Sequence, residues 1–351
     1  PALFGKTGSG GEKPVSMAAE SVPLWRQVAK QSVWGRRGIA KASSLWLPLV
    51  LILGPFIPGN PSLLWNVFRI FFIVVLWESA SILANDLSDC RADLAAGKRR
   101  WICSLSRQTA SAIIILLVAS GWLFLLLFKS PLATIGAYSG SIFLGLAYSI
   151  PPLRFKERGG LGILAYSLAC TLAYVFIPWT WVGARALSLL ILTPAVFLDK
   201  WVNLHFHQVL DFPADSTGHT LTYAVRAGIE PATRRLQFAA ALASLSFLAV
   251  MAWSVSLFPA WSLIILTSAV GTTLAGAAFV RLRRAQASSQ TALLRELPWF
   301  YLSLTFAVFR VLPLVLLAGM ALLESRLWAA FGLAFLVIAA ESRYLYFYRL
   351  E

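Results

Sequence analysis

Residues 62–93 read SLLWNVFRIFFIVVLWESASILANDLSDCRAD, and this stretch decides the fold. Its first part, 62–84, is mostly apolar and has the length of about 20 residues that an α-helix needs to cross a bilayer. The apolar run stops at Asn85, and three aspartates follow before the stretch ends. A membrane-spanning helix that ends in a cluster of acids is therefore the first structural prediction.

The same apolar pattern recurs along the whole chain of 351 residues. Only 13% of the residues are charged and 58% are hydrophobic, whereas an average soluble domain has about 25% charged residues. We predict an all-α, multi-pass transmembrane helical bundle of 9–10 helices. The first candidate span is short and carries Pro55 and Pro58 near its end, and for this span and for the last one a re-entrant segment is the alternative. The predicted spans are 44–59, 62–84, 109–128, 131–150, 160–182, 186–210, 237–257, 260–280, 299–319 and 326–342.

Basic residues set the predicted orientation of this bundle. Alternate loops hold 24 of the 30 Lys and Arg residues, and such loops stay on the cytoplasmic side. Both termini are then cytoplasmic, with a flexible basic segment at 1–43, the bundle at 44–342 and a short tail at 343–351. The net charge of +15 is loop charge, because no basic stretch forms a separate soluble module, so we expect no nucleic-acid partner. Nothing in the sequence indicates the oligomeric state.

Three cysteines, Cys90, Cys103 and Cys170, lack the CxxC or CxxH spacing of common zinc sites. We therefore expect neither a zinc site nor a disulfide framework.

The acids gather after two of the spans. On a helix, Asp86, Asp89 and Asp93 follow a spacing of i, i+3 and i+7, and Asn85 precedes Asp89 by four residues, so their oxygens share one face. Asp211 and Asp215 repeat the four-residue spacing after the sixth span. Carboxylates this close repel one another and favour a cation, and hard oxygen ligands suit Mg²⁺ shared with substrate phosphates. The alternative is that they are ordinary solvated loop charges.

Basic side chains that could bind phosphate stand beside the first acids. Lys98, Arg99 and Arg100 follow them, and Arg154, Lys156 and Arg158 fill the loop after the fourth span. Arginine suits bidentate phosphate contacts and lysine supplies a point charge. The alternative is that some of these bases only keep their loops on the cytoplasmic side and bind no phosphate.

These stretches together resemble the UbiA superfamily of intramembrane prenyltransferases. Residues 85–93 match its NDxxDxxxD motif, residues 211–215 match its DxxxD motif, and residues 148–156 are similar to its YSxPPxRxK segment. The similarity covers roughly residues 45–260. One departure is the sequence Lys98-Arg99-Arg100-Trp101, where the family commonly has an Arg-Pro pair, which leaves open which base takes that role.

The resemblance implies a central cavity capped by cytoplasmic loops, in which Mg²⁺ binds an isoprenyl diphosphate and an allylic cation is attacked by a small aromatic or quinone-precursor acceptor. It implies one Mg²⁺ on Asn85, Asp86, Asp89 and Asp93 and another on Asp211 and Asp215. Asp86, Asp89, Asp211, Asp215 and Tyr148 are the expected catalytic residues, and Lys98, Arg99, Arg154 and Lys156 the expected diphosphate ligands. The prenyl tail would lie toward the lipid bilayer.

Two further residues are candidates for acceptor binding. His207 lies four residues before Asp211, and Glu78 lies two helical turns before Asn85. Ionisable residues within a span are functional candidates in general, although a structural role is the alternative for both.

Two other functions remain open at this point. A membrane terpene cyclase would use the same ionisation without an acceptor, and a transporter would also have many spans. The transporter explains neither the two acid clusters on one side nor the segment at 148–156.

Overall fold

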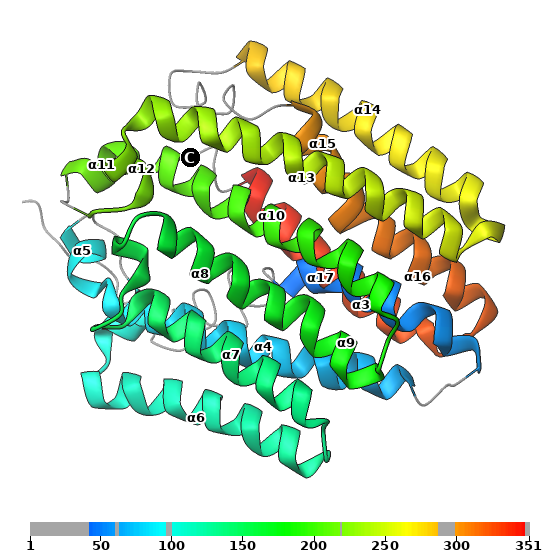
Figure 1. Ribbon diagram of the computed structural model, residues 1–351, viewed down its shortest axis with the longest axis horizontal. Helices are drawn as coiled ribbons and strands as arrows, with labels where there is room; N and C mark the ends of the chain where they lie inside the picture. Colours follow the sequence, from blue (N-terminus) through cyan, green and yellow to red (C-terminus); the bar gives the residue numbers. More distant parts are fainter. Residues whose placement is uncertain (1–41, 60–62, 96–99, 218–219, 287–298, 348–351) are drawn as a thin grey trace, which may run out of the picture.

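A computed structural model describes residues 42–59, 63–95, 100–217, 220–286 and 299–347 of the chain, and these residues form helices and connecting turns without a strand. The helices run roughly along one common direction (Figure 1). In lipid, helices satisfy all their backbone hydrogen bonds internally, which is why long apolar segments adopt this form. The predicted all-α membrane bundle is confirmed.

All ten predicted apolar segments form helices, and eight helices among the described residues are long and apolar enough to cross a membrane. The other two, Ser43–Phe56 and Leu327–Ala340, are shorter. The seventh helix begins at Ile229 rather than at 237, because Pro231 is tolerated in a first helical turn. The eight spans are Leu64–Ser88, Arg107–Leu127, Leu132–Ser149, Gly160–Val182, Ala186–Leu210, Ile229–Leu257, Pro259–Gly276 and Phe300–Leu323.

Neighbouring helices surround a common interior. α4 packs against α6 and α7, α7 against α8, α8 against α10, and α10 against α13, while α17 contacts α4 from the other side. Two spans contain one π-helical segment each, η5 and η8. The bounds are α4 (Leu63–Ser88), α6 (Arg107–Leu127), α7 (Leu132–Ser149), α8 (Gly160–Thr171), η5 (Leu172–Phe176), α9 (Ile177–Val182), α10 (Ala186–Leu210), α13 (Ile229–Leu257), α14 (Ser262–Gln286), α15 (Trp299–Phe306), η8 (Ala307–Val311), α16 (Leu312–Leu323) and α17 (Leu327–Phe347).

The short first helix lies in that interior. All eight residues of α3 (Trp46–Leu53) are buried, and α3 contacts α4, α9, α10 and α16. Eight residues span only about 12 Å, so α3 alone is too short to cross a bilayer. It follows η1 (Ala42–Leu45) and is continued by η2 (Gly54–Gly59), which contains the two prolines that ended the predicted span.

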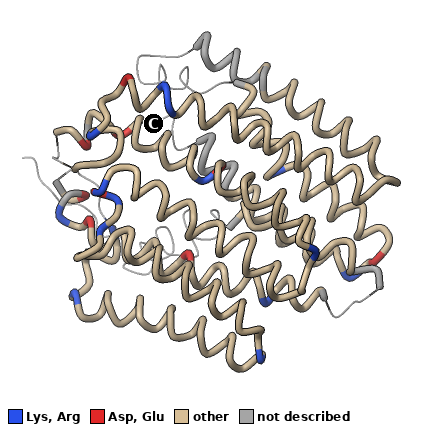
Figure 2. Tube along the Cα trace, in the orientation of Figure 1, with Lys and Arg blue, Asp and Glu red and all other residues tan. Residues whose placement is uncertain are grey.

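Most of the charged residues in the described part of the chain lie at one end of the bundle (Figure 2). The same end carries the short helices α5 (Cys90–Ala95), α11 (Phe212–Thr217) and α12 (Tyr223–Ala227) (Figure 1). We call it the charged end. The predicted N-terminal segment lies almost entirely outside the described residues, and α17 continues as a helix through 343–347.

Gly162 determines how closely α8 approaches the turn η4 (Phe155–Glu157) at the charged end. A Cβ atom on Gly162 would lie 2.7 Å from the Phe155 carbonyl oxygen and 2.9 Å from Lys156 Cα. Since both are backbone atoms, we expect Gly162→Ala to lower the free energy of unfolding by about 1–3 kcal/mol. Thermal unfolding in detergent measures the change.

The matched control is Gly136→Ala on α7, where the added Cβ meets nothing within 4 Å. This control should unfold at or slightly above the wild-type temperature, because alanine favours the helix. Equal melting temperatures for Gly162→Ala and wild type would show that η4 adjusts at no cost.

Candidate active site

The first acid cluster lies where α4 ends and α5 begins. The Asp89 amide donates to the Asn85 carbonyl at 3.0 Å, and the Asp93 amide donates to the Asp89 carbonyl at 2.8 Å. These bonds keep helical spacing across the junction, so Asn85, Asp89 and Asp93 follow one face as the sequence predicts. Asp86 is buried, whereas Asp89 and Asp93 are half-buried.

The loop after α7 contacts this cluster directly. Ser149 Oγ donates to Asn85 Oδ1 at 3.0 Å, and Lys156 forms an ion pair with Asp89. Lys156 Nζ also lies 3.2 Å from Ser88 Oγ and 3.5 Å from Asn85 Oδ1. The predicted base Lys156 therefore sits on the first acid cluster.

Burial makes the Lys156 charge depend on these partners. The side chain is only 6% exposed, and this desolvation lowers the pKa of the ammonium group, while the carboxylate of Asp89 acts in the opposite direction. A buried ammonium group is stable as a cation only beside an anion. The arrangement keeps a positive charge next to the acids in a place that water barely reaches.

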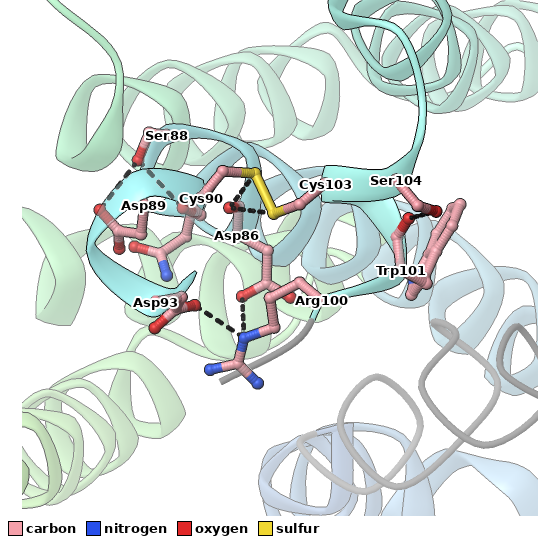
Figure 3. The surroundings of a disulfide bond; sticks show 10 residues. Asp86, Ser88, Asp89, Cys90, Asp93, Arg100, Trp101, Cys103 and Ser104 are labelled. Atoms are coloured by element: carbon pink, nitrogen blue, oxygen red, sulfur yellow. Dashed lines mark hydrogen bonds and ion pairs between the residues drawn. A yellow bond between two sulfur atoms is a disulfide. The ribbon is translucent and has the colours of Figure 1, made fainter. Parts of the chain in front are cut away.

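Two arginines complete the charge balance around these acids. Arg154 Nη2 lies 3.8 Å from Asp89 Oδ1, and Arg154 Nε lies 2.7 Å from Glu157 Oε1. Arg100 Nε lies 2.8 Å from Asp93 Oδ2 and 3.8 Å from Asp86 Oδ1 (Figure 3). Among the described residues, Lys156, Arg154 and Arg100 thus accompany the three aspartates of the cluster.

Arg100 was among the bases that could bind phosphate, but it was not among the diphosphate ligands that the resemblance implied. Lys98 and Arg99, which were the implied ligands from the same basic stretch, lie outside the described residues. The only sequence signal for Arg100 was its place in this basic stretch. Sequence position does not show which base of a loop turns toward the acids, because the loop conformation decides that.

A disulfide corrects the prediction made for the cysteines. Cys90 and Cys103 form a bond that links α5 to η3 (Trp101–Ser104), with Cα atoms 5.6 Å apart (Figure 3). The spacing of 13 residues matches no metal motif, and contact between the two side chains arises only because the loop folds back on α4. Cys170 is buried and takes part in no disulfide.

The second acid motif ends α10. Asp211 is exposed at the helix end, and the Asp215 amide donates to the Asp211 carbonyl at 2.8 Å, so the four-residue spacing is again helical. Thr222 Oγ1 donates to Asp215 Oδ2 at 3.1 Å. This threonine, which the sequence analysis did not select, fixes the rotamer of one predicted metal ligand.

Tyr148 lies close enough to both acid motifs for its hydroxyl to interact electrostatically with Asp89 of the first and with Asp215 of the second. A second link joins the loops, because Arg226 Nη2 on α12 donates to the Glu157 carbonyl at 2.8 Å. Segments that are more than 100 residues apart in sequence are therefore brought together at the charged end.

The two candidate acceptor residues lie at different depths. His207 is half-buried one turn before Asp211 on α10. Glu78 is buried two turns, or about 10 Å, below Asn85, and Tyr174 donates a hydrogen bond of 2.8 Å to its Oε1.

A second set of polar side chains continues from Glu78 into the bundle. Lys200 Nζ lies 5.4 Å from the centre of the Tyr174 ring, 3.2 Å from Asp199 Oδ2 and 2.6 Å from Ser44 Oγ. Glu78 thus belongs to a deeper polar layer than the acid motifs.

The donor chemistry of the acid motifs fits Mg²⁺. Each motif offers a pair of carboxylates one turn apart, and Mg²⁺ typically takes one or two carboxylates and completes its shell with water and phosphate oxygens. No group of three or more His, Cys, Asp or Glu side chains in the described parts of the chain surrounds one point. Carboxylates in this spacing are the kind of ligand that binds Mg²⁺ together with phosphate oxygens.

Comparison with known proteins agrees with this arrangement. A model of the UbiA prenyltransferase family matches residues 45–305, which include both acid motifs and the loop at 148–156. A probable homogentisate phytyltransferase 2 of the chloroplast from Oryza sativa subsp. japonica is 28% identical over 167 residues. That match covers 43% of this chain and 40% of the relative, so the chain spans less than half the length of this curated relative.

Solved structures show the same fold. A UbiA homologue from Archaeoglobus fulgidus bound to DMAPP and Mg²⁺ superposes with a TM-score of 0.55 at 18% identity, covering 86% of this chain and 98% of that one. The same homologue bound to GPP and Mg²⁺ gives a TM-score of 0.53 at 16% identity with the same coverage. At such identities the likeness establishes the helical architecture.

Alkylation in denaturant tests the disulfide. Protein purified without reductant should carry one alkylated cysteine, Cys170, in its intact mass, and three after reduction, because the pair Cys90–Cys103 reacts only as free thiols. In the matched variant Cys170→Ser, unreduced protein should carry none. Three alkylated cysteines in unreduced wild type would contradict the link.

Proposed function

Because the chain belongs to the UbiA prenyltransferase family, we propose that it transfers an isoprenyl group from its diphosphate to a small aromatic acceptor. The observation that carries the proposal is that the loop after α7 reaches both acid regions, because Lys156 pairs with Asp89 and the Glu157 carbonyl accepts a hydrogen bond from Arg226 beyond the second motif. Three buried or half-buried bases, Lys156, Arg154 and Arg100, lie beside the first motif. The names of the similar proteins, with isoprenyl diphosphates in two structures and homogentisate in the rice relative, support the substrate classes.

The proposed reaction breaks the bond between C1 of the prenyl group and the diphosphate oxygen. The diphosphate leaves with the electron pair, the allylic cation bonds to an electron-rich acceptor carbon, and that carbon loses a proton. Held by Asn85, Asp86, Asp89 and Asp93 and by Asp211 and Asp215, Mg²⁺ would supply charge that stabilises the leaving diphosphate.

The chain's own bases bind the same leaving group in this proposal. Lys156, Arg154 and Arg100 contact carboxylates in the structure, and they can turn to phosphate oxygens when Mg²⁺ compensates those carboxylates. Preorganised charges at a dry site usually give the largest catalytic contribution. Lys98 and Arg99 remain candidates for the same role from the adjoining segment.

Tyr148 and Glu78 serve the organic part of the substrates in the proposal. The Tyr148 ring lies 6.1 Å from the Tyr166 ring, and aromatic faces stabilise cations nearby. Glu78 and His207 stay candidates for acceptor contacts from below and beside the acid motifs.

Removal of one acid from either motif tests the proposal. We expect Asp86→Asn and Asp211→Asn each to lower Mg²⁺-dependent diphosphate release by about 100-fold or more, because one interaction with the transition-state charge is lost. Release from geranyl, farnesyl and geranylgeranyl diphosphates is measured in nanodiscs, with and without homogentisate.

The matched control is Glu230→Gln, which removes an exposed acid that is paired with Arg234 at 4.0 Å on α13. Its activity should equal that of the wild type, since exposed ion pairs contribute little. Full activity of both aspartate variants would refute the metal–diphosphate site, and release without acceptor, with hydrocarbon or terpene alcohol products, would identify a terpene cyclase instead.

We also propose that the charged end faces the cytoplasm, because it carries the basic loops. In intact cells, a membrane-impermeant maleimide should label Ser325→Cys in the turn between α16 and α17, which is exposed at the opposite end. Ser216→Cys, exposed on α11, should react only after permeabilisation. Labelling in the reverse order would invert the orientation.

A further inference from the structure

Gln208 on α10 is a buried amide whose hydrogen-bonding capacity is unused. Its side chain is 5% exposed, and neither Oε1 nor Nε2 has a hydrogen-bond partner among the described residues. A buried polar group without a partner costs about 1–3 kcal/mol, and most such groups in native proteins are paired. An amide kept in this state at the edge of a catalytic site indicates that a ligand completes its hydrogen bonds.

The position of this amide follows from its place on α10, one turn before Asp211. The Gln208 side chain approaches the Tyr148 hydroxyl, which is the group that interacts with both Asp89 and Asp215. Gln208 precedes Asp211 by three residues, so both share a helix face and Gln208 lies about 4.5 Å deeper in the bundle. The amide therefore lies between the acid motifs and on their membrane side.

The chemistry at this point differs from that around the first acid cluster. Lys156, Arg154 and Arg100 place positive charge there, which suits a diphosphate. Gln208 and Tyr148 are neutral, and together they offer amide donors, a carbonyl acceptor and a hydroxyl. A neutral group that both donates and accepts hydrogen bonds is the complementary ligand.

We propose that Gln208 binds the phenolic hydroxyl of the aromatic acceptor and holds its ring beside the bond that breaks. The proposal rests on the proposed function and specifies its acceptor as a hydroxyl-bearing ring. The Tyr148 and Tyr166 rings, 6.1 Å apart and inclined by 51°, provide an aromatic wall next to the amide. A ring bound there lies on the membrane side of the metal ligands, where C1 of the prenyl group emerges from the diphosphate.

The alternative for Gln208 is a purely structural tie between α10 and α7. In that case a small rotation would bond the amide to the Tyr148 hydroxyl, and its loss would affect stability. Binding of the two substrates separates these roles, because a structural tie does not discriminate between a phenol and a diphosphate.

The test compares Gln208→Met, which keeps the length of the side chain without its polar atoms, with Gln237→Met. Gln237 is exposed on α13, so this control makes the same chemical change away from the site. Each folded protein is titrated with homogentisate, with its dimethyl ether and with geranyl thiodiphosphate, which resists cleavage. The homogentisate titration uses protein saturated with Mg²⁺ and the thiodiphosphate.

We expect Gln208→Met to weaken homogentisate binding by about 10-fold to 100-fold and to leave thiodiphosphate binding unchanged. The wild type should bind the dimethyl ether about as weakly as Gln208→Met binds homogentisate, and Gln237→Met should behave as the wild type throughout.

Unchanged homogentisate binding by Gln208→Met, equal weakening of both ligands, or a wild type that binds the thiodiphosphate but no phenol would each overturn the inference, while leaving prenyl transfer standing. A wild type that binds no thiodiphosphate would refute the proposed function and the inference with it.

Discussion

The ion pair between Lys156 and Asp89 joins two segments that are otherwise separate in the sequence, and the arrangement of the charged end depends on it. Asp89 ends one membrane-spanning helix, and Lys156 belongs to the loop after another. Because Lys156 is buried, its charge is stable only while the acids stay in place. The loop also carries Arg154 and, through Glu157, contacts Arg226 beyond the second motif. One ion pair with a buried lysine thus lies where bases and acids from three parts of the chain come together.

The membrane explains why this end can be both charged and dry. Helices satisfy their backbone hydrogen bonds internally and can therefore lie in lipid. Charged side chains are costly there, so most of them lie where several helices end together. Deeper polar groups follow the same rule by pairing inside the bundle, as Tyr174 does with Glu78 and Lys200 with Asp199. Polarity therefore decreases along the helices from the charged end to the paired polar groups in the interior. Such a gradient suits a substrate with a diphosphate head and a hydrocarbon tail.

The features that the sequence predicted well are those that local periodicity encodes. Apolar length fixed the ten helical segments, and helical spacing placed Asn85, Asp89 and Asp93 on one face. Features set by loop folding were not predictable in this way. Arg100 contacts the acids because of the turn at η3. The disulfide and the isolation of the Gln208 amide are also tertiary facts, since both depend on which helices become neighbours.

Cys90 lies inside the first acid motif, and its disulfide to Cys103 makes the motif sensitive to thiols, which the carboxylates alone would not be. Disulfides persist in oxidising compartments and are opened by cellular thiols in reducing ones. In this structure a covalent ring of residues 90–103 contains the whole basic stretch, and Arg100 also contacts Asp93 and Asp86. The thiol–disulfide balance of the surroundings therefore decides whether Arg100 is joined to the first acid motif by a covalent ring as well as by its ion pairs.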